Sequence, residues 1–190
     1  MESQRNIYEV PQSLPDPEDD GACNHLPGMR LPSVSLISTA GDLVALSTLA
    51  GTTIVYCYPL TGGPDQDLPP GWDDIPGARG CTPQSCAFRD HHAELEKRGA
   101  RVFGLSVQDT AYQREAAERL RLPFRLLSDE KLEFARALDL PTFEAEGMTL
   151  IKRLTLVVED GKILKVFYPV FPPGRNAEDV LSWLSERITS

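Results

Sequence analysis

The sequence predicts an α/β fold with a mixed central β-sheet flanked by helices. β-prone runs alternate with helical patterns over residues 52–138, and two apolar runs near the end flank the turn signal Asp160-Gly161. Alternating strands and helices are typical of a parallel sheet, and a closing hairpin adds antiparallel strands. The 190 residues suffice for one hydrophobic core, so we expect a single folded domain.

Residues 1–30 are predicted to form an extended tail. The segment contains four prolines and a cluster of acidic residues at 16–20, and it includes Cys23. This composition disfavours regular structure. We therefore place the folded domain at residues 31–190 and expect Cys23 to lie in a mobile tail, away from any chemistry.

A hairpin and a buried strand are predicted at the start of the domain. Residues 34–38 and 43–46 alternate around Ala40-Gly41-Asp42, which indicates a hairpin. Residues 52–58 form a continuous β-prone run, typical of a central strand that is buried on both faces. The glycine- and proline-rich break at 60–80 is longer than most loops, and such loops often have a function.

A helix is predicted directly after this loop. Thr82 is a suitable N-cap residue, Pro83 fits the first helical position, and Gly99 ends the pattern. Cys81 therefore lies where the loop meets the helix start, and Cys86 lies further along the same helix.

The rest of the chain continues the alternation. Ser128 or Asp129 is expected to cap one helix, and Asn176 the last one. The predicted elements are strands at 101–107 and 124–127, helices at 110–121 and 129–138, paired strands at 150–158 and 162–168, and a helix at 176–187.

Charge and hydropathy exclude several classes of partner. The formal net charge is -9, and the basic residues form no stripe, which argues against nucleic acid and anionic membranes. The first residues lack the pattern of a secretory signal, and no window approaches the roughly 18 apolar residues of a spanning helix. We expect a cytoplasmic protein, in which cysteines are more often catalytic or metal-binding than cross-linked.

Cys81 is the candidate activated nucleophile. The partial positive charge and unpaired N–H groups of a helix start favour thiolate over thiol. Arg79 adds positive charge if its side chain turns inward. From the residues alone, an inert loop cysteine at 81 and a core cysteine at 86 are an equally good interpretation. A metal site of Cys81, Cys86 and the two histidines at 91–92 fits the usual ligand spacings poorly. We expect Cys57 to be a residue of the hydrophobic core.

The spacing of Cys81 and Cys86 has a conformational consequence. On one ideal helix they would be rotated by ~140° and separated by ~7.5 Å of rise, which places the Cα atoms ~8–9 Å apart. A disulfide needs a Cα separation below roughly 7 Å. A bridge between them would therefore require the first turns of the helix to unwind.

Five stretches of the sequence match the motifs of a known family. They are Tyr56-Cys57-Tyr58-Pro59, Gly80-Cys81-Thr82-Pro83-Gln84-Ser85-Cys86-Ala87-Phe88-Arg89-Asp90, Val102-Phe103-Gly104-Leu105-Ser106, Phe124-Arg125-Leu126-Leu127-Ser128-Asp129 and Lys152-Arg153-Leu154-Thr155-Leu156. In this order and spacing, the chain resembles the peroxiredoxins over residues 30–188. Within them it is similar to the bacterioferritin-comigratory or peroxiredoxin Q group.

The resemblance implies a thioredoxin-like fold and a thiol-dependent peroxidase for hydrogen peroxide and organic hydroperoxides. It implies that Cys81 is the peroxidatic cysteine, Cys86 the resolving cysteine, and Arg153 the residue that stabilises the thiolate and polarises the peroxide. A thioredoxin-like protein would then reduce the Cys81–Cys86 disulfide, without a metal, flavin or nucleotide cofactor. Because the resolving cysteine is internal, we expect a monomer.

The chain departs from the family in two places near Cys81. Ala78 occupies the position of the family's usual threonine, and the loop at 60–80 is longer than usual. Thr61 is one candidate to supply the missing hydroxyl. Alternatively, Arg79 or backbone N–H groups take over its hydrogen-bonding role. Pro59, Thr61 and Arg79 are therefore the candidate substrate-binding residues.

A redox-sensing interaction module is the alternative function. It would use the same two cysteines, with the acidic loop and tail as a docking surface, and the missing threonine favours it. A disulfide reductase fits less well because the chain lacks a C-x-x-C motif.

Overall fold

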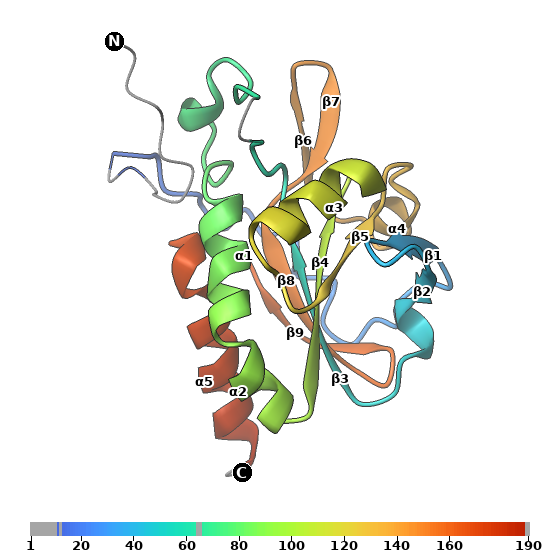
Figure 1. Cartoon of the computed structure of the whole chain (residues 1–190). Coiled ribbons are helices and arrows are strands. Elements are labelled where there is room, and N and C mark those ends of the chain that lie inside the picture. Colours follow the sequence, from blue (N-terminus) through green and yellow to red (C-terminus); the bar gives the residue numbers. More distant parts are fainter. Residues whose placement is uncertain (1–10, 12, 64–65, 189–190) are drawn as a thin grey trace.

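A seven-stranded mixed β-sheet forms the centre of the molecule (Figure 1). The computed structural model describes residues 11, 13–63 and 66–188. The strands of this sheet are β1 (Ser35–Ser38), β2 (Leu43–Ala45), β3 (Thr52–Cys57), β4 (Ala100–Ser106), β5 (Arg125–Ser128), β8 (Leu154–Glu159) and β9 (Lys162–Phe167). Their order is β2-β1-β5-β4-β3-β8-β9, with β5, β4 and β3 parallel and the outer pairs antiparallel.

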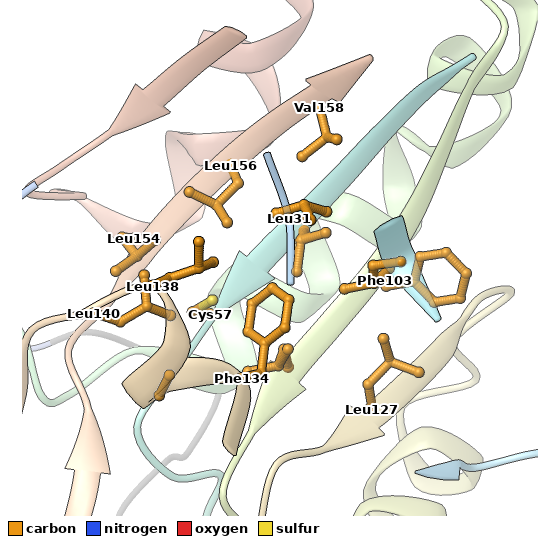
Figure 2. Close-up of a cluster of buried hydrophobic side chains, with 14 of the residues drawn as sticks. Leu31, Cys57, Phe103, Leu127, Phe134, Leu138, Leu140, Leu154, Leu156 and Val158 are labelled. Carbon is orange, nitrogen blue, oxygen red and sulfur yellow. The ribbon is translucent and has the colours of Figure 1, made fainter. Parts of the chain in front are cut away.

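Two hydrophobic clusters lie on opposite faces of this sheet. The helices are α1 (Cys81–Asp90), α2 (His92–Lys97), α3 (Thr110–Arg119), α4 (Glu133–Ala137) and α5 (Asn176–Ile188). On one face, α1, α2 and α5 pack against Ile54 and Tyr56 of β3, and Figure 1 shows these helices side by side. On the other face, α4 packs against Val55 and Cys57, and Figure 2 shows that second cluster. The alternation follows from the period of two along a strand.

The predicted α/β fold, the first hairpin and the buried central strand are confirmed. β1 and β2 pair antiparallel across the predicted turn. β3 lies between β4 and β8, and residues 53–57 of it are buried. A strand covered on both faces gains from being apolar throughout, which explains the continuous pattern of this run.

The predicted strand at 150–158 is wrong, because it divides at Lys152 and Arg153. Its first part belongs to a separate hairpin, in which β7 (Met148–Ile151) pairs with β6 (Thr142–Ala145). The Lys152 ammonium reaches Asp20 at 2.9 Å, and the Arg153 guanidinium reaches the start of α1. Two charged residues whose side chains bind different parts of the molecule interrupt the apolar run, so β8 begins only at Leu154.

The helix predicted to start at Pro83, with Thr82 as its N-cap residue, and to end at Gly99 differs from the structure at both its start and its middle. It begins at Cys81, because Gly80 adopts the left-handed φ of 109° as its N-cap residue, and Thr82 lies within the first turn. It divides at His91, where the backbone turns before α2. Cys81 is therefore the first helical residue.

The segment at 21–31 packs on the sheet. Cys23 and Leu26 are buried in the cluster of the second face, so the expected mobile position of Cys23 is wrong. Backbone hydrogen bonds from Gly28 N to Ile163 O and from Ile163 N to Met29 O hold the segment to β9. The pairing is long-range, and no local pattern signals it. The domain boundary at residue 30 stays a prediction.

Replacing Gly104 with alanine is expected to lower the free energy of unfolding by about 1–3 kcal/mol. A Cβ atom at this position in β4 would lie 2.5 Å from Leu126 Cδ2 and 2.7 Å from the Tyr56 ring. Urea unfolding measures the change, with Gly174→Ala as control, because that position has open space. Equal stability of Gly104→Ala and the wild type would contradict the expected clash.

Candidate active site

Cys81 lies at the N-terminus of α1, beneath the loop that precedes it. Cys81 is 3 % exposed. No side chain caps the helix, so the N-terminal N–H groups and their partial positive charge face the region of the cysteine. Ala78 O accepts a hydrogen bond from the Cys81 Sγ at 3.7 Å. The sequence expectation of a cysteine at a helix start is confirmed.

Arg153 is brought to the same place from the start of β8. Its Nη2 atom lies 3.2 Å from Cys81 Sγ and also donates to Ala78 O at 3.0 Å and Arg79 O at 3.2 Å. The Arg153 residue is 4 % exposed. The guanidinium is permanently charged and planar, so these bonds fix a positive charge at the sulfur.

The Gln84 amide holds Arg153, and the Asn176 amide holds Gln84 in turn. The sequence did not predict a role at the site for either amide. Arg153 Nη1 donates to Gln84 Oε1 at 2.5 Å, and Gln84 Nε2 donates to Asn176 Oδ1 at 2.9 Å. Thr155 Oγ1 donates to the same Asn176 oxygen at 2.6 Å. Asn176 is thus the first residue of α5 and a buried network member, and the predicted capping role is wrong. The i, i+3 spacing of Cys81 and Gln84, which places them on one helix face, is the signal available in the sequence.

A small cavity lies over the sulfur. Its volume is about 20 Å³. It is lined by Cys81, by Arg79, Gly80 and Thr82 beside it, and by Leu60, Gly62, Leu68 and Trp72 from the long loop. The described part of the long loop therefore forms one wall of the site through these four residues.

The candidate substrate-binding residues occupy different positions. Arg79 lines the cavity and donates to Asp73 at 2.9 Å. Thr61 is buried beside the site, where its hydroxyl donates to Gln108 Oε1 at 3.0 Å. Among the described residues, neither Thr61 nor the buried Pro59 lines the cavity. Thr61 is thus engaged elsewhere, whereas Arg79 is at the site.

Cys86 shares α1 with Cys81, and both are free thiols. Burial raises the pKa of Cys86 above its ordinary value, with Arg89 opposing the shift and Asp90 adding to it. Burial also raises the pKa of Cys23 to about 12 and raises the pKa of Cys57 further. The latter two stay protonated near neutral pH, and because only the thiolate is a good nucleophile, they are inert there.

The structure also bears on metal and membrane binding. Within residues 13–63 and 66–188, no group of three or more His, Cys, Asp or Glu side chains is placed to hold a metal ion. In the same part of the chain, no helix has the length and apolar character needed to cross a membrane.

Comparison with known proteins agrees with this geometry. The Redoxin family profile matches residues 26–181. Chloroplastic peroxiredoxin Q from Gentiana triflora is 32% identical over 185 residues, covering 94% of this chain and 77% of the relative. The protein of the same name from Populus jackii is 33% identical over 159 residues, covering 83% of this chain and 67% of the relative.

Solved structures show the same fold. Peroxidoxin BcpB from Mycobacterium tuberculosis superposes with a TM-score of 0.70 at 26% identity, covering 85% of this chain and 98% of that one. The bacterioferritin comigratory protein of Xanthomonas campestris superposes with a TM-score of 0.66 at 23% identity, covering 84% of this chain and 97% of that one. The thioredoxin-like fold expected from the sequence is confirmed.

The Redoxin match and the peroxiredoxin Q relatives show that the chain is a thiol-dependent peroxidase, and the thioredoxin-like sheet with a buried cysteine at a helix start fits that class. The chain belongs to the Redoxin family and, within it, to the peroxiredoxin Q or bacterioferritin-comigratory group.

Proposed function

We propose that Cys81 is the peroxidatic cysteine of this peroxidase and Cys86 the resolving cysteine, with hydrogen peroxide and organic hydroperoxides as substrates. The observation that carries the proposal is the 3.2 Å contact between Arg153 Nη2 and Cys81 Sγ at the start of α1. A charged donor at this distance favours negative charge on the sulfur. A second arginine, Arg79, lines the cavity in which a peroxide would meet the sulfur.

The first step is a displacement at a peroxide oxygen. The Cys81 thiolate attacks one oxygen, the O–O bond breaks, and the sulfur becomes a sulfenic acid. The other oxygen leaves with the bonding electrons and takes up a proton, which gives water or an alcohol. Arg153 donates toward the negative charge that develops on these oxygens, in a site that is largely closed to water.

The second step requires α1 to unwind at its start. Cys81 and Cys86 occupy the first and sixth positions of one helix, so their Cα atoms are ~8–9 Å apart on ideal geometry, beyond disulfide range. No side chain caps the helix at Gly80, so opening the first turn breaks no side-chain cap bond, although Gln84 must release Arg153 and Asn176. The Cys86 thiolate then attacks the sulfenic sulfur, a disulfide forms, and the sulfenic oxygen leaves as water.

A dithiol protein of the thioredoxin type would complete the cycle. Its thiolate attacks the Cys81–Cys86 disulfide, and its second thiol releases the mixed disulfide, which returns both cysteines as thiols. The proposed enzyme works as a monomer, because one chain carries both cysteines, and its location is the cytoplasm. Its net charge of -9 disfavours nucleic acid as a partner.

One equivalent of hydrogen peroxide is expected to join the Cys81 and Cys86 peptides in the mass spectrum of the reduced protein. The Cys86→Ser variant should instead hold one sulfenic acid per chain at Cys81, and its turnover with thioredoxin should fall about 10-fold or more, because the internal attacking thiol is gone. Cys23→Ser is the matched control and should turn over like the wild type. A crosslink that includes Cys23 or Cys57 instead would contradict the assignment.

Disulfide formation after a single oxidation is expected to speed up with pH. Because the pKa of Cys86 is raised, the attacking thiolate is the minor form near neutral pH. Its fraction, and hence the rate, should grow about tenfold for each pH unit below that pKa. Trapping the remaining sulfenic acid with dimedone at timed intervals between pH 6 and pH 8 measures the rate. A pH-independent rate would show that another step sets it.

A further inference from the structure

The wall of the cavity over Cys81 is built around a tryptophan. Trp72 is 2 % exposed and lies in a short 3-10 helix, Trp72–Asp74, within the long loop. It lines the cavity together with Leu60 and Leu68 of the same loop. The side of the site that faces away from α1 is therefore formed by large apolar side chains.

This wall is fixed at several points. The Trp72 and Phe143 ring centroids are 6.0 Å apart, and Trp72 packs in one cluster with Ala145 and Leu150 of the β6–β7 hairpin. The neighbouring Asp73 carboxylate accepts a hydrogen bond from Arg79 at 2.9 Å, which ties the 3-10 helix to the residues just before Cys81. A buried indole held in this way moves only if the hairpin contact or the ion pair also gives way.

The cavity that remains is too small for most hydroperoxides. A volume of about 20 Å³ corresponds to roughly one or two water molecules, since one water needs about 10–15 Å³ on this measure. To react, a hydroperoxide must place one oxygen against the sulfur, and its substituent then lies among the residues that line the cavity. Hydrogen peroxide has no carbon substituent, whereas a tert-butyl or cumyl group is larger than the cavity and would press on this lining, in which Trp72 is the largest side chain.

We infer that Trp72 is a specificity-determining residue that makes this enzyme favour hydrogen peroxide over bulky organic hydroperoxides. The inference rests on the proposed function of Cys81 and adds the size of substrate that the site accepts. Trp72 acts by excluding volume. The bulky substrates react only in the fraction of molecules in which the wall has opened.

The test is a size series in single-turnover oxidation of Cys81. The reduced wild type is mixed with excess hydrogen peroxide, tert-butyl hydroperoxide or cumene hydroperoxide, and the second-order rate constant is taken from intact-protein masses. We expect the rate constants to fall in that order. In Trp72→Ala, the ratio of the cumene to the hydrogen peroxide rate constant should rise about 10-fold or more, as expected for opening an apolar pocket.

The chain offers a matched control in its second tryptophan. Trp183 lies in α5 against Arg187, so Trp183→Phe should keep the wild-type ratio. The wild-type series needs no substitution and tests the inference even if Trp72→Ala does not fold, and Trp72→Phe gives a milder change. A wild type that reacts as fast with cumene hydroperoxide as with hydrogen peroxide, or an unchanged ratio in a folded Trp72→Ala, would overturn the inference. If none of the three peroxides oxidises Cys81, the proposed function itself fails and the inference fails with it.

Discussion

Replacement of Cys81 by serine is expected to lower peroxide consumption about a thousandfold or more, because the reaction loses its nucleophile. A serine hydroxyl has nearly the shape of the thiol, but it stays protonated beside Arg153 and attacks an O–O bond poorly. The other cysteines cannot replace the missing sulfur. Cys23 and Cys57 are buried thiols with raised pKa values, and Cys86 faces away from the cavity residues by its position in α1.

The measurement is the steady-state rate with hydrogen peroxide and a thioredoxin system. Cys23→Ser serves as the matched control, since it also removes one thiol but lies outside the site. Thermal unfolding checks that both variants fold. Activity of folded Cys81→Ser near the wild-type value would refute the assignment of the peroxidatic cysteine.

Replacement of Arg153 by methionine is expected to lower the second-order rate constant for peroxide about 100- to 1,000-fold, the range found when a preorganised donor is removed. Methionine keeps much of the volume but removes the charge 3.2 Å from Cys81 Sγ. It also leaves Gln84 Oε1 and Ala78 O without their arginine donors. Both the thiolate and the developing charge on the peroxide lose their stabilising partner.

Two further variants separate charge from geometry. Arg153→Lys keeps the positive charge but cannot reproduce the planar fork, so its rate should lie between those of methionine and wild type. Arg125→Met removes a half-exposed arginine that pairs with Asp42 and should react like the wild type. Stopped-flow oxidation under single-turnover conditions measures all four proteins. Equal rates for Arg153→Met and the wild type would show that this guanidinium does not assist the reaction.

Local patterns predicted much of the fold. The strand β3 and the turn between β8 and β9 could be predicted from the sequence. The burial of a single strand and the geometry of a tight turn both depend on residues that are neighbours in the chain. The threonine and proline after Cys81 predicted a helix start two residues later than the observed one, with Thr82 in place of Gly80 as the N-cap residue. Errors arose where distant groups decide the local structure, as at Arg153, which leaves its apolar run to reach α1.

An α/β domain, a cysteine at a helix start, a second cysteine on the same helix and, from the motifs, the family can all be predicted from the sequence. How the site is closed depends on contacts between distant parts of the chain. The sheet register brings Arg153 to Cys81 across 72 positions of sequence, and the Gln84–Asn176 bond spans 92. The same holds for Trp72, whose place over the sulfur depends on packing against the β6–β7 hairpin. Periodicity records which face of an element is buried, but which buried groups meet depends on how separate elements pack together.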